Sequence, residues 1–140
     1  MPRVVVDPGV LVSAVITPNG LCGQILRQAI SGSIALLASP AVLEELADVL
    51  SRPKFRRYLS LEEVDTFVAL VARVADIHPD PPGAQAYSND PDDDYLIAHA
   101  LSLHADHLIS GDTHLQAMTN VEVSVMTPRA FLERYRGADE

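Results

Sequence analysis

Short apolar runs that end abruptly at polar or proline-containing segments alternate along this chain with amphipathic stretches. The first run, Val4-Val5-Val6, is β-branched and unbroken, which is typical of a strand covered on both faces, and Asp7-Pro8-Gly9 ends it. Because strands that alternate with helices form parallel sheets, the pattern predicts an α/β fold with helices on both faces of a mainly parallel sheet. The other predicted strands are 34–38, a short one at 75–77, 107–110 and 121–125.

Helix signals fill the intervals between these strands. Ser39-Pro40 and Thr127-Pro128 each place a capping hydroxyl before a proline at the first helical position, and Ser60 with Glu63 forms a capping box. Asp90-Pro91 repeats the cap-and-proline pattern after a proline-rich segment, 78–91, that is predicted to be a loop. The predicted helices run over 20–30, from 40 to just before Pro53, over 61–74, from 91 to about 103, and from 128 onward.

Length and cysteine content restrict the class of protein. A chain of 140 residues fits one domain, 1–140, and its hydrophobic fraction of 48% argues against disorder. The lone Cys22 cannot form an intrachain disulfide or a thiolate metal site, which favours a reducing compartment and so the cytoplasm. No apolar run has the form of a secretory signal or the length of a membrane span, so we expect neither export nor membrane insertion.

The charge of the chain is unevenly distributed. A formal net charge of −9 argues against a protein that coats nucleic acid, because such binding depends on phosphate neutralisation, but it does not exclude a nuclease. One short run is basic and contains Arg52, Lys54, Arg56 and Arg57. Such a run is typical of a solvated helix surface, and it can also contact RNA phosphates or a partner protein.

Acidic residues fall where predicted strands end and predicted helices begin. Asp7 and Asp112 follow strands, and the Asp92–Asp94 triplet opens a helix. Because sites in a parallel sheet form beyond the carboxyl ends of its strands, these groups can share one edge, where several carboxylates would hold a divalent cation. In the simpler interpretation, Asp7 forms a turn and the triplet caps a helix. Capping needs only one or two of the three acids, and Asp94 continues the predicted buried stripe of Ile97, Ala98 and Leu101.

One glutamate of the Glu44-Glu45 pair can join these acids. Both lie in the first turns of the helix that begins at Pro40, next to the same predicted edge. We expect Glu45 to face the site and Glu44 to be solvated, although the sequence leaves the choice between them open.

Several motifs, taken in order, resemble those of PIN-domain proteins, most closely the branch of toxins in bacterial toxin–antitoxin pairs related to VapC-type toxins. The motifs are Val4–Asp7, Ser39–Leu46, Asp90–Ala98, Leu108–Asp112 and Thr127–Leu132. The resemblance implies a three-layer α/β/α fold and a Mg²⁺- or Mn²⁺-dependent ribonuclease whose products carry 5′-phosphate and 3′-hydroxyl groups. It also implies an RNA substrate, a cognate antitoxin protein and a homodimer.

The resemblance implies a role for each matching acid. Asp7, Glu45, Asp94 and Asp112 would be the catalytic and metal-binding acids, with Asp93 as a fifth ligand and Ser110 as a supporting hydroxyl. They would hold one or two ions. The chain departs from the family pattern at Pro8-Gly9, where relatives usually have Thr-Asn, and at His114, where many have a further Asp.

Other sites fit the sequence less well. A phosphotransferase using Asp7 as nucleophile would need a second acid where Gly9 stands, and a dinucleotide fold would need a glycine-rich turn after the first strand. Zinc bound by His99, His104, His107 and His114 has no cysteine pair to support it, and a hydrolase triad lacks a nucleophile elbow. The main alternative is a PIN-like protein-binding module with weak or no nuclease activity, which Pro8-Gly9 favours and the four retained acids oppose.

Overall fold

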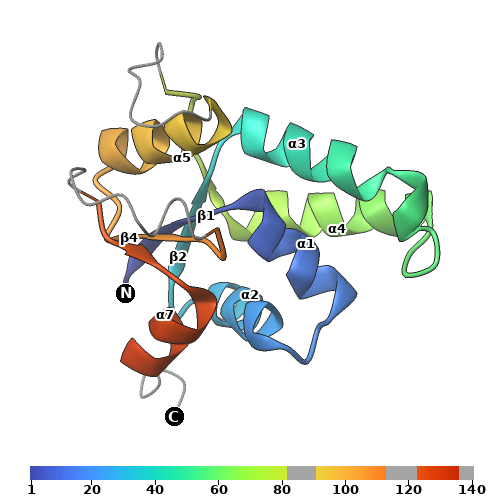
Figure 1. Cartoon of the computed structure of the whole chain (residues 1–140), viewed down its shortest axis with the longest axis horizontal. Helices are drawn as coiled ribbons and strands as arrows, with labels where there is room; N and C mark the ends of the chain where they lie inside the picture. The colour runs from blue at the N-terminus through green and yellow to red at the C-terminus, as the bar shows by residue number, and fades with distance from the viewer. Residues whose placement is uncertain (82–90, 113–122, 136–140) are drawn as a thin grey trace.

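A five-stranded, all-parallel sheet forms the centre of the molecule (Figure 1). Its strand order is β3-β2-β1-β4-β5. The computed structural model describes residues 1–81, 91–112 and 123–135, with the backbone alone for 91–94. The strands are β1 (Arg3–Val6), β2 (Ala35–Ala38), β3 (Asp76–Ile77), β4 (His107–Ile109) and β5 (Val125–Met126). Because all strands are parallel, their carboxyl ends meet at one edge, and Asp7, Ser39 and Ser110 follow three of these ends.

Alternate residues of the strands pack on opposite faces of the sheet. Val4 pairs with Leu36, and both lie in the larger core, whereas Val5 pairs with Leu108 in the smaller core on the other face. The valines of β1 are almost completely buried, as expected for a central strand covered on both sides.

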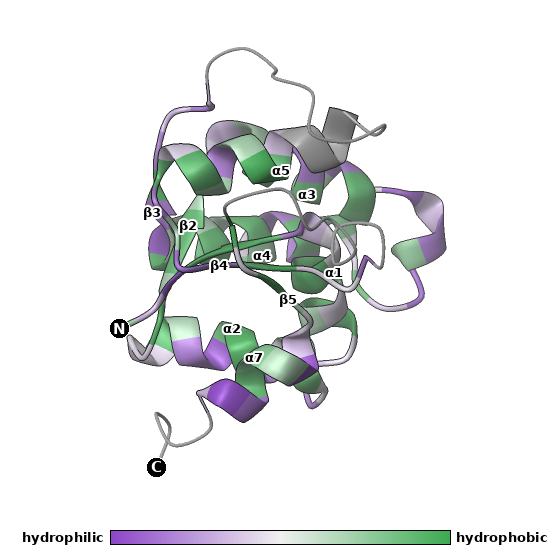
Figure 2. Ribbon diagram, turned by 60° about the vertical axis from the view of Figure 1, so that its left-hand side comes forward, coloured by the Kyte–Doolittle hydropathy of each residue, from purple (hydrophilic) through white to green (hydrophobic). Residues whose placement is uncertain are grey.

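The two faces carry different sets of helices. The larger core is covered by α1 (Pro8–Ile16), α2 (Leu21–Ser31), α3 (Pro40–Leu50), α4 (Leu61–Val74) and α7 (Pro128–Arg134), and a 3-10 turn, η1 (Pro53–Phe55), follows α3. The smaller core is covered by α5 (Pro91–Ser102). Figure 2 shows the sheet between α5 on one side and α2 and α7 on the other. The predicted α/β/α arrangement with a parallel sheet is therefore confirmed.

The starts of α3, α4 and α7 follow from caps in the sequence. Ser39 and Thr127 accept hydrogen bonds from Val42 N and Ala130 N, and the capping box of Ser60 and Glu63 is complete. At the carboxyl end of α2, the capping residue Gly32 has a left-handed φ of 84°, a conformation that favours glycine.

The helix α1 was not predicted. Its residues Val10, Leu11 and Ala14 are buried, and apolar residues occupy almost the whole helix, so no periodic pattern distinguishes it in the sequence. Asp7-Pro8-Gly9, interpreted as the end of a strand, is at the same time the start of this helix, with Asp7 as N-cap and Pro8 at the first position.

Two other predictions differ in detail. On α5 the buried residues that pack on the sheet core include Leu96, Ile97 and Ala100, whereas the predicted Ala98 and Leu101 are only half-buried. The predicted strand 121–125 begins outside the described residues, and the strand that forms is β5, which runs one residue further to Met126. Its position is set by pairing with Leu108 and Ile109 on β4, which local sequence does not reveal.

Among the described residues, no single helix has both the length and the apolarity to cross a bilayer. Helices α1 and α2 reach that length only together, and they are bent by 100°.

Candidate functional site

Asp7 is held at the carboxyl end of β1 through its backbone and its side chain. Its N–H donates to Ile109 O on the neighbouring strand at 2.9 Å, which extends the pairing of β1 with β4 by one residue. Its carboxylate oxygen Oδ1 accepts a hydrogen bond from Gly9 N at 2.9 Å, as the N-cap of α1. The carboxylate is therefore fixed in direction while it stays half-buried at the sheet edge.

A buried hydroxyl connects Asp7 with Asp112. Ser110 Oγ donates to Asp7 Oδ2 at 2.9 Å and accepts from Asp112 N at 3.0 Å. Ser110 itself is fully buried, whereas Asp7 and Asp112 are half-buried at the edge of the sheet. The structure thus brings together three of the predicted site residues, which come from the ends of β1 and β4.

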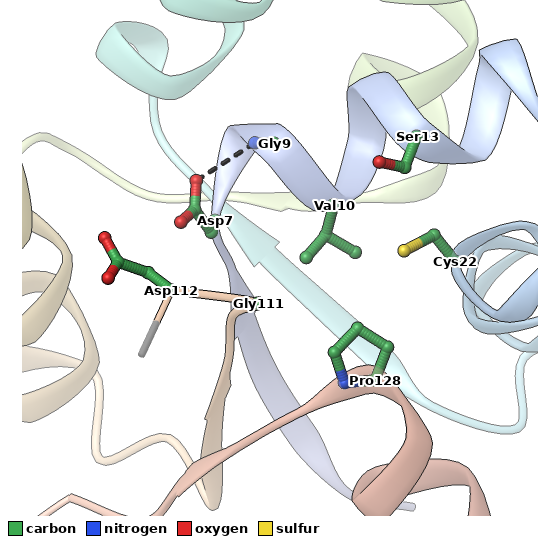
Figure 3. Close-up of a pocket in the computed structure, with 8 residues that line it drawn as sticks. All are labelled: Asp7, Gly9, Val10, Ser13, Cys22, Gly111, Asp112 and Pro128. Carbon is green, nitrogen blue, oxygen red and sulfur yellow. Dashed lines mark hydrogen bonds between the residues drawn. The ribbon is translucent and has the colours of Figure 1, made fainter. Parts of the chain in front are cut away.

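These two acids border a cavity of about 410 Å³. Figure 3 shows Asp7 and Asp112 on one side of it and Ser13, Cys22 and Pro128 on the other. The complete lining is Asp7, Gly9, Val10, Ser13, Cys22, Gly111, Asp112 and Pro128. Carboxylate oxygens that face an open cavity are the ligands that Mg²⁺ and Mn²⁺ prefer, so this pair suits a hard divalent cation.

The predicted acids on the helices are only partly described. Glu45 is exposed on α3. Burial is the main cause that raises the pKa of Tyr95, the residue that follows Asp94, and the charge of Glu45 is the smallest, so Glu45 lies within electrostatic range of that residue. Glu44 is also exposed. The side chains of Asp93 and Asp94 lie outside the described residues. Among the side chains that are described, no three of His, Cys, Asp and Glu are grouped closely enough to hold a metal ion.

A hydroxyl cluster fixes the start of α5 at the same edge. The hydroxyl of Tyr95 is hydrogen-bonded to Ser39 Oγ, directly after β2, and donates to Asp80 Oδ1 at 2.8 Å. Asp80 Oδ1 also accepts from Ala41 N at 3.1 Å, in the first turn of α3. The first turn of α5, with its acidic triplet, is therefore held next to α3 and to the carboxyl end of β2.

The same cluster shifts two pKa values. Burial above all, and then the hydrogen bond and charge of Asp80, raise the pKa of Tyr95 to about 12, although its bond to Ser39 acts in the opposite direction. The bond from Tyr95 lowers the pKa of Asp80. We did not predict this cluster, because Ser39 was interpreted only as a cap and Asp80 only as part of a loop.

The basic run lies elsewhere. Arg56 donates through Nη2 to Leu50 O, at the carboxyl end of α3, and Arg52 pairs with Asp48 at 3.7 Å. Lys54 and Arg57 lie over the rings of Phe55 and Tyr58 at 5.1 and 5.4 Å. All four basic residues are described, and none of them lines the cavity beside Asp7. Because α3 starts at the sheet edge and runs away from it, the structure separates this run from the acids (Figure 1). Its contact with RNA or a partner stays a prediction.

None of the described histidines lines the cavity beside Asp7. His107 is buried, with Nδ1 bonded to Ser124 Oγ at 2.9 Å and Nε2 bonded to Tyr135 OH at 2.6 Å. His99 is fully buried on α5 beside Tyr95, with ring centroids 5.9 Å apart. Burial is the main cause that lowers the pKa of each ring. His114 lies outside the described residues.

Comparisons with known proteins agree with this architecture. The family model described as PIN domain matches residues 3–114. The uncharacterized protein MJ1680 of Methanocaldococcus jannaschii is 29% identical over 142 residues, covering 95% of this chain and 91% of the relative.

Two crystal structures share the fold at low identity. VapBC2 from Rickettsia felis, bound to a DNA fragment from its promoter, has a TM-score of 0.64 at 13% identity and covers 89% of this chain and 98% of that chain. PAE2754 from Pyrobaculum aerophilum has a TM-score of 0.64 at 15% identity and covers 97% of this chain and 90% of that chain.

Proposed function

The chain belongs to the PIN-domain family, whose members are generally nucleases, and from this premise we propose that it is a Mg²⁺- or Mn²⁺-dependent ribonuclease. The observation that carries the proposal is the Ser110 bridge between Asp7 and Asp112 at the mouth of the cavity. Two carboxylates that border one cavity at a sheet edge repel each other, and a bound divalent cation relieves that repulsion.

Asp7 and Asp112 would hold the ion together with Glu45 and Asp94, with Asp93 as a fifth ligand. The backbone supports this grouping, because Tyr95 bonds to Ser39 and so places the first turn of α5 at the carboxyl edge of the sheet. A bound ion would supply an activated water and neutralise charge on the phosphodiester. The role of the chain is to fix the carboxylates before the substrate arrives: Gly9 N and Ser110 Oγ each orient one oxygen of Asp7.

We further propose that the protein is the toxin of a toxin–antitoxin pair, acts in the cytoplasm as a homodimer and binds a cognate antitoxin. The structural likeness to VapBC2 supports an antitoxin partner, together with the sequence motifs. A PIN-like module that binds protein and cuts RNA weakly remains the second candidate. It is favoured by Pro8-Gly9, which leaves the first two positions of α1 without a polar side chain next to Asp7.

Metal binding is the first test of the ribonuclease proposal. We expect Mn²⁺ or Mg²⁺ to bind by calorimetry and to raise the melting temperature, with about 2.7 kcal/mol of stabilisation at a hundredfold excess over the dissociation constant. Single-stranded RNA should be cut with Mn²⁺ and left intact with EDTA, giving 5′-phosphate and 3′-hydroxyl ends.

The variant Asp65→Asn is the control, because Asp65 is exposed on α4 and does not line the cavity. It should behave as the wild type in all three measurements. Melting that is independent of metal, combined with intact RNA, would overturn the ribonuclease and leave the protein-binding module.

A further inference from the structure

A second hollow of about 390 Å³ lies beside the cavity of the acids. The two share Ser13, Cys22 and Pro128, so they are neighbours, and the second hollow lies on the far side of these three residues from Asp7 and Asp112. In Figure 3 the three shared residues lie on the side of the cavity opposite the two acids. The remaining lining residues of the second hollow are Thr17, Gly20, Leu21, Thr127 and Arg129.

One wall of the hollow is held rigidly by the loop between α1 and α2. Gly20 N donates to Thr17 O at 2.9 Å, and Arg27 Nη1 donates to Pro18 O at 2.6 Å. At Gly23 the helix and loop approach so closely that a Cβ would lie 1.9 Å from Pro18 O. The wall is therefore formed before any ligand binds, which reduces the entropy lost on binding.

The chemistry of the second hollow differs from that of the first. The acid cavity has two carboxylates, whereas Arg129 is the single charged residue that lines the second hollow. Its other walls combine apolar groups of Leu21 and Pro128 with the hydroxyls of Thr17 and Thr127. An arginine at the rim suits a phosphate, and apolar walls with a few hydroxyls suit the flat, partly polar surface of a nucleobase.

We propose that this hollow, defined by Thr17, Leu21, Cys22 and Arg129, is a nucleotide subsite of single-stranded RNA. It takes the base and sugar of a nucleotide next to the phosphodiester that would lie at the metal ion of Asp7 and Asp112, and Arg129 contacts a neighbouring phosphate. This inference rests on the proposed ribonuclease function and adds to it a prediction of specificity. Because the volume of the hollow fits about one nucleotide, the identity of one base beside the cut determines the cleavage rate.

The volume and the charge favour RNA over a peptide as the occupant. About 390 Å³ lies in the range of about 300–1,000 Å³ that is usual for small-molecule sites, which fits one nucleotide rather than a helix. The chain has a net charge of −9, so most of its surface repels an anionic RNA strand. Arg129, in the hollow next to the proposed cation site, gives that strand a local positive charge to bind.

The first experiment measures binding of a fluorescent single-stranded RNA octamer to the full chain by anisotropy in EDTA, where the proposed cleavage does not occur. Arg129→Ala should weaken binding about 10-fold for every sequence, as expected for a phosphate contact. Arg134→Ala is the matched control, since it removes the same charge from the same helix and Arg134 does not line the hollow. Equal affinities for the two variants would overturn the subsite.

The second experiment uses Cys22, the single cysteine, as a probe in the wild type. The octamer should slow alkylation of Cys22 by N-ethylmaleimide at least about 5-fold at saturation, because the base covers the thiol. A labelling rate unchanged by RNA would overturn the proposal. Leu21→Trp, which fills the hollow, should also change which base precedes or follows the cut in Mn²⁺, and an unchanged cleavage pattern would count equally against the subsite.

The outcomes separate the two proposals. Cleavage of RNA by the wild type, with unprotected Cys22 and no effect of Arg129→Ala, removes the subsite and keeps the ribonuclease. Protection of Cys22 and weakened binding by Arg129→Ala, without cleavage in any metal, keeps the subsite and removes the ribonuclease.

Discussion

Two junctions at the carboxyl edge of the sheet start from nearly the same local sequence. Asp7-Pro8-Gly9-Val10 follows β1, and Ser39-Pro40-Ala41-Val42 follows the neighbouring strand β2. In each, a residue with extended backbone caps a helix and a proline occupies the first helical position. The local physics of the two junctions is therefore the same.

Their side chains nevertheless reach different surroundings. Asp7 is half-buried, faces a cavity and accepts a bond from Ser110, whereas Ser39 is fully buried and bonds to Tyr95. At the open junction, neighbouring residues leave a cavity beside Asp7, and this helix cap is a candidate metal ligand. At the closed junction, neighbouring residues cover Ser39, and this cap only stabilises the fold. Substitutions that give one junction a side chain of the other test whether the surroundings, rather than the local sequence, cause the difference.

The largest effect is expected from placing a carboxylate at the closed junction. Ser39→Asp would bury a charge beside Asp80, which already bonds to Tyr95, and we expect a loss of about 3–5 kcal/mol in the free energy of unfolding. Urea denaturation measures it. The neutral, equally large Ser39→Asn is the control and should lose much less. Equal losses of stability in the two variants would show that the size of the side chain at position 39, rather than its charge, causes the destabilisation.

The reverse change removes the carboxylate from the open junction and keeps a cap. Asp7→Ser should lower RNA cleavage in Mn²⁺ at least about 100-fold, because the placement of the metal supplies most of the rate, with the free energy of unfolding nearly unchanged. Initial cleavage rates and urea denaturation measure the two quantities. Asp65→Ser on α4 serves as the control, and cleavage by Asp7→Ser at the wild-type rate would indicate a contaminating nuclease.

Acid should weaken the junction at Ser39 through His99, whose ring lies beside that of Tyr95. Burial, which dominates, and the charge of His78 lower the pKa of His99, although Asp80 acts in the opposite direction. The unfolded chain then binds the proton more readily, so the free energy of unfolding falls as pH decreases from about 6.5 through the lowered pKa.

Thermal melts at pH 8 and pH 5 measure this dependence. His99→Leu should melt with a smaller difference between the two pH values, while a smaller dependence remains from buried His107. The exposed His104, with a φ of 52°, provides the control as His104→Asn, which tolerates that backbone. An undiminished pH dependence in His99→Leu would place its cause elsewhere.

The smallest expected effect on stability is at Gly9, which corresponds to Ala41 in the other junction. Gly9→Ala reproduces the Ala41 of the other junction, and its Cβ would lie 3.5 Å from Asp7 Oδ1, an ordinary contact. Among the described glycines only Gly32 has a positive φ, so Gly9 needs no special backbone conformation.

We expect Gly9→Ala to increase the free energy of unfolding by about 0.5–1 kcal/mol, because the unfolded chain loses freedom. Urea denaturation measures the gain. Gly23→Ala is the contrasting variant, since its Cβ would lie 1.9 Å from Pro18 O, and it should destabilise the protein. A loss of stability in Gly9→Ala would mean that the first turn of α1 is less open than its geometry indicates.

The sequence alone determined the features that depend on a few neighbouring residues. The strand at Val4–Val6, the capping box at Ser60 and the proline-started helices are short-range patterns, and the structure confirms them. Alternation of strands and helices then required a parallel sheet, and a parallel sheet required Asp7 and Asp112 to share an edge. The uniformly apolar α1 was missed, because a buried helix has no polar face to mark its period.

Only the tertiary structure decided which polar groups meet. Ser110 and Asp7 are 103 positions apart, and Ser39 and Tyr95 are 56 apart, so neither hydrogen bond has a local signature. Ser110 entered the predicted site through the resemblance to a family rather than through its own surroundings, and the Tyr95 cluster was not predicted at all. The same reason explains the basic run: its composition suggested a contact with RNA, but the direction of α3 carries it away from the acids, with Arg56 bonded to the end of that helix. Composition and spacing specify what a residue can bind, whereas its partners depend on how distant segments pack.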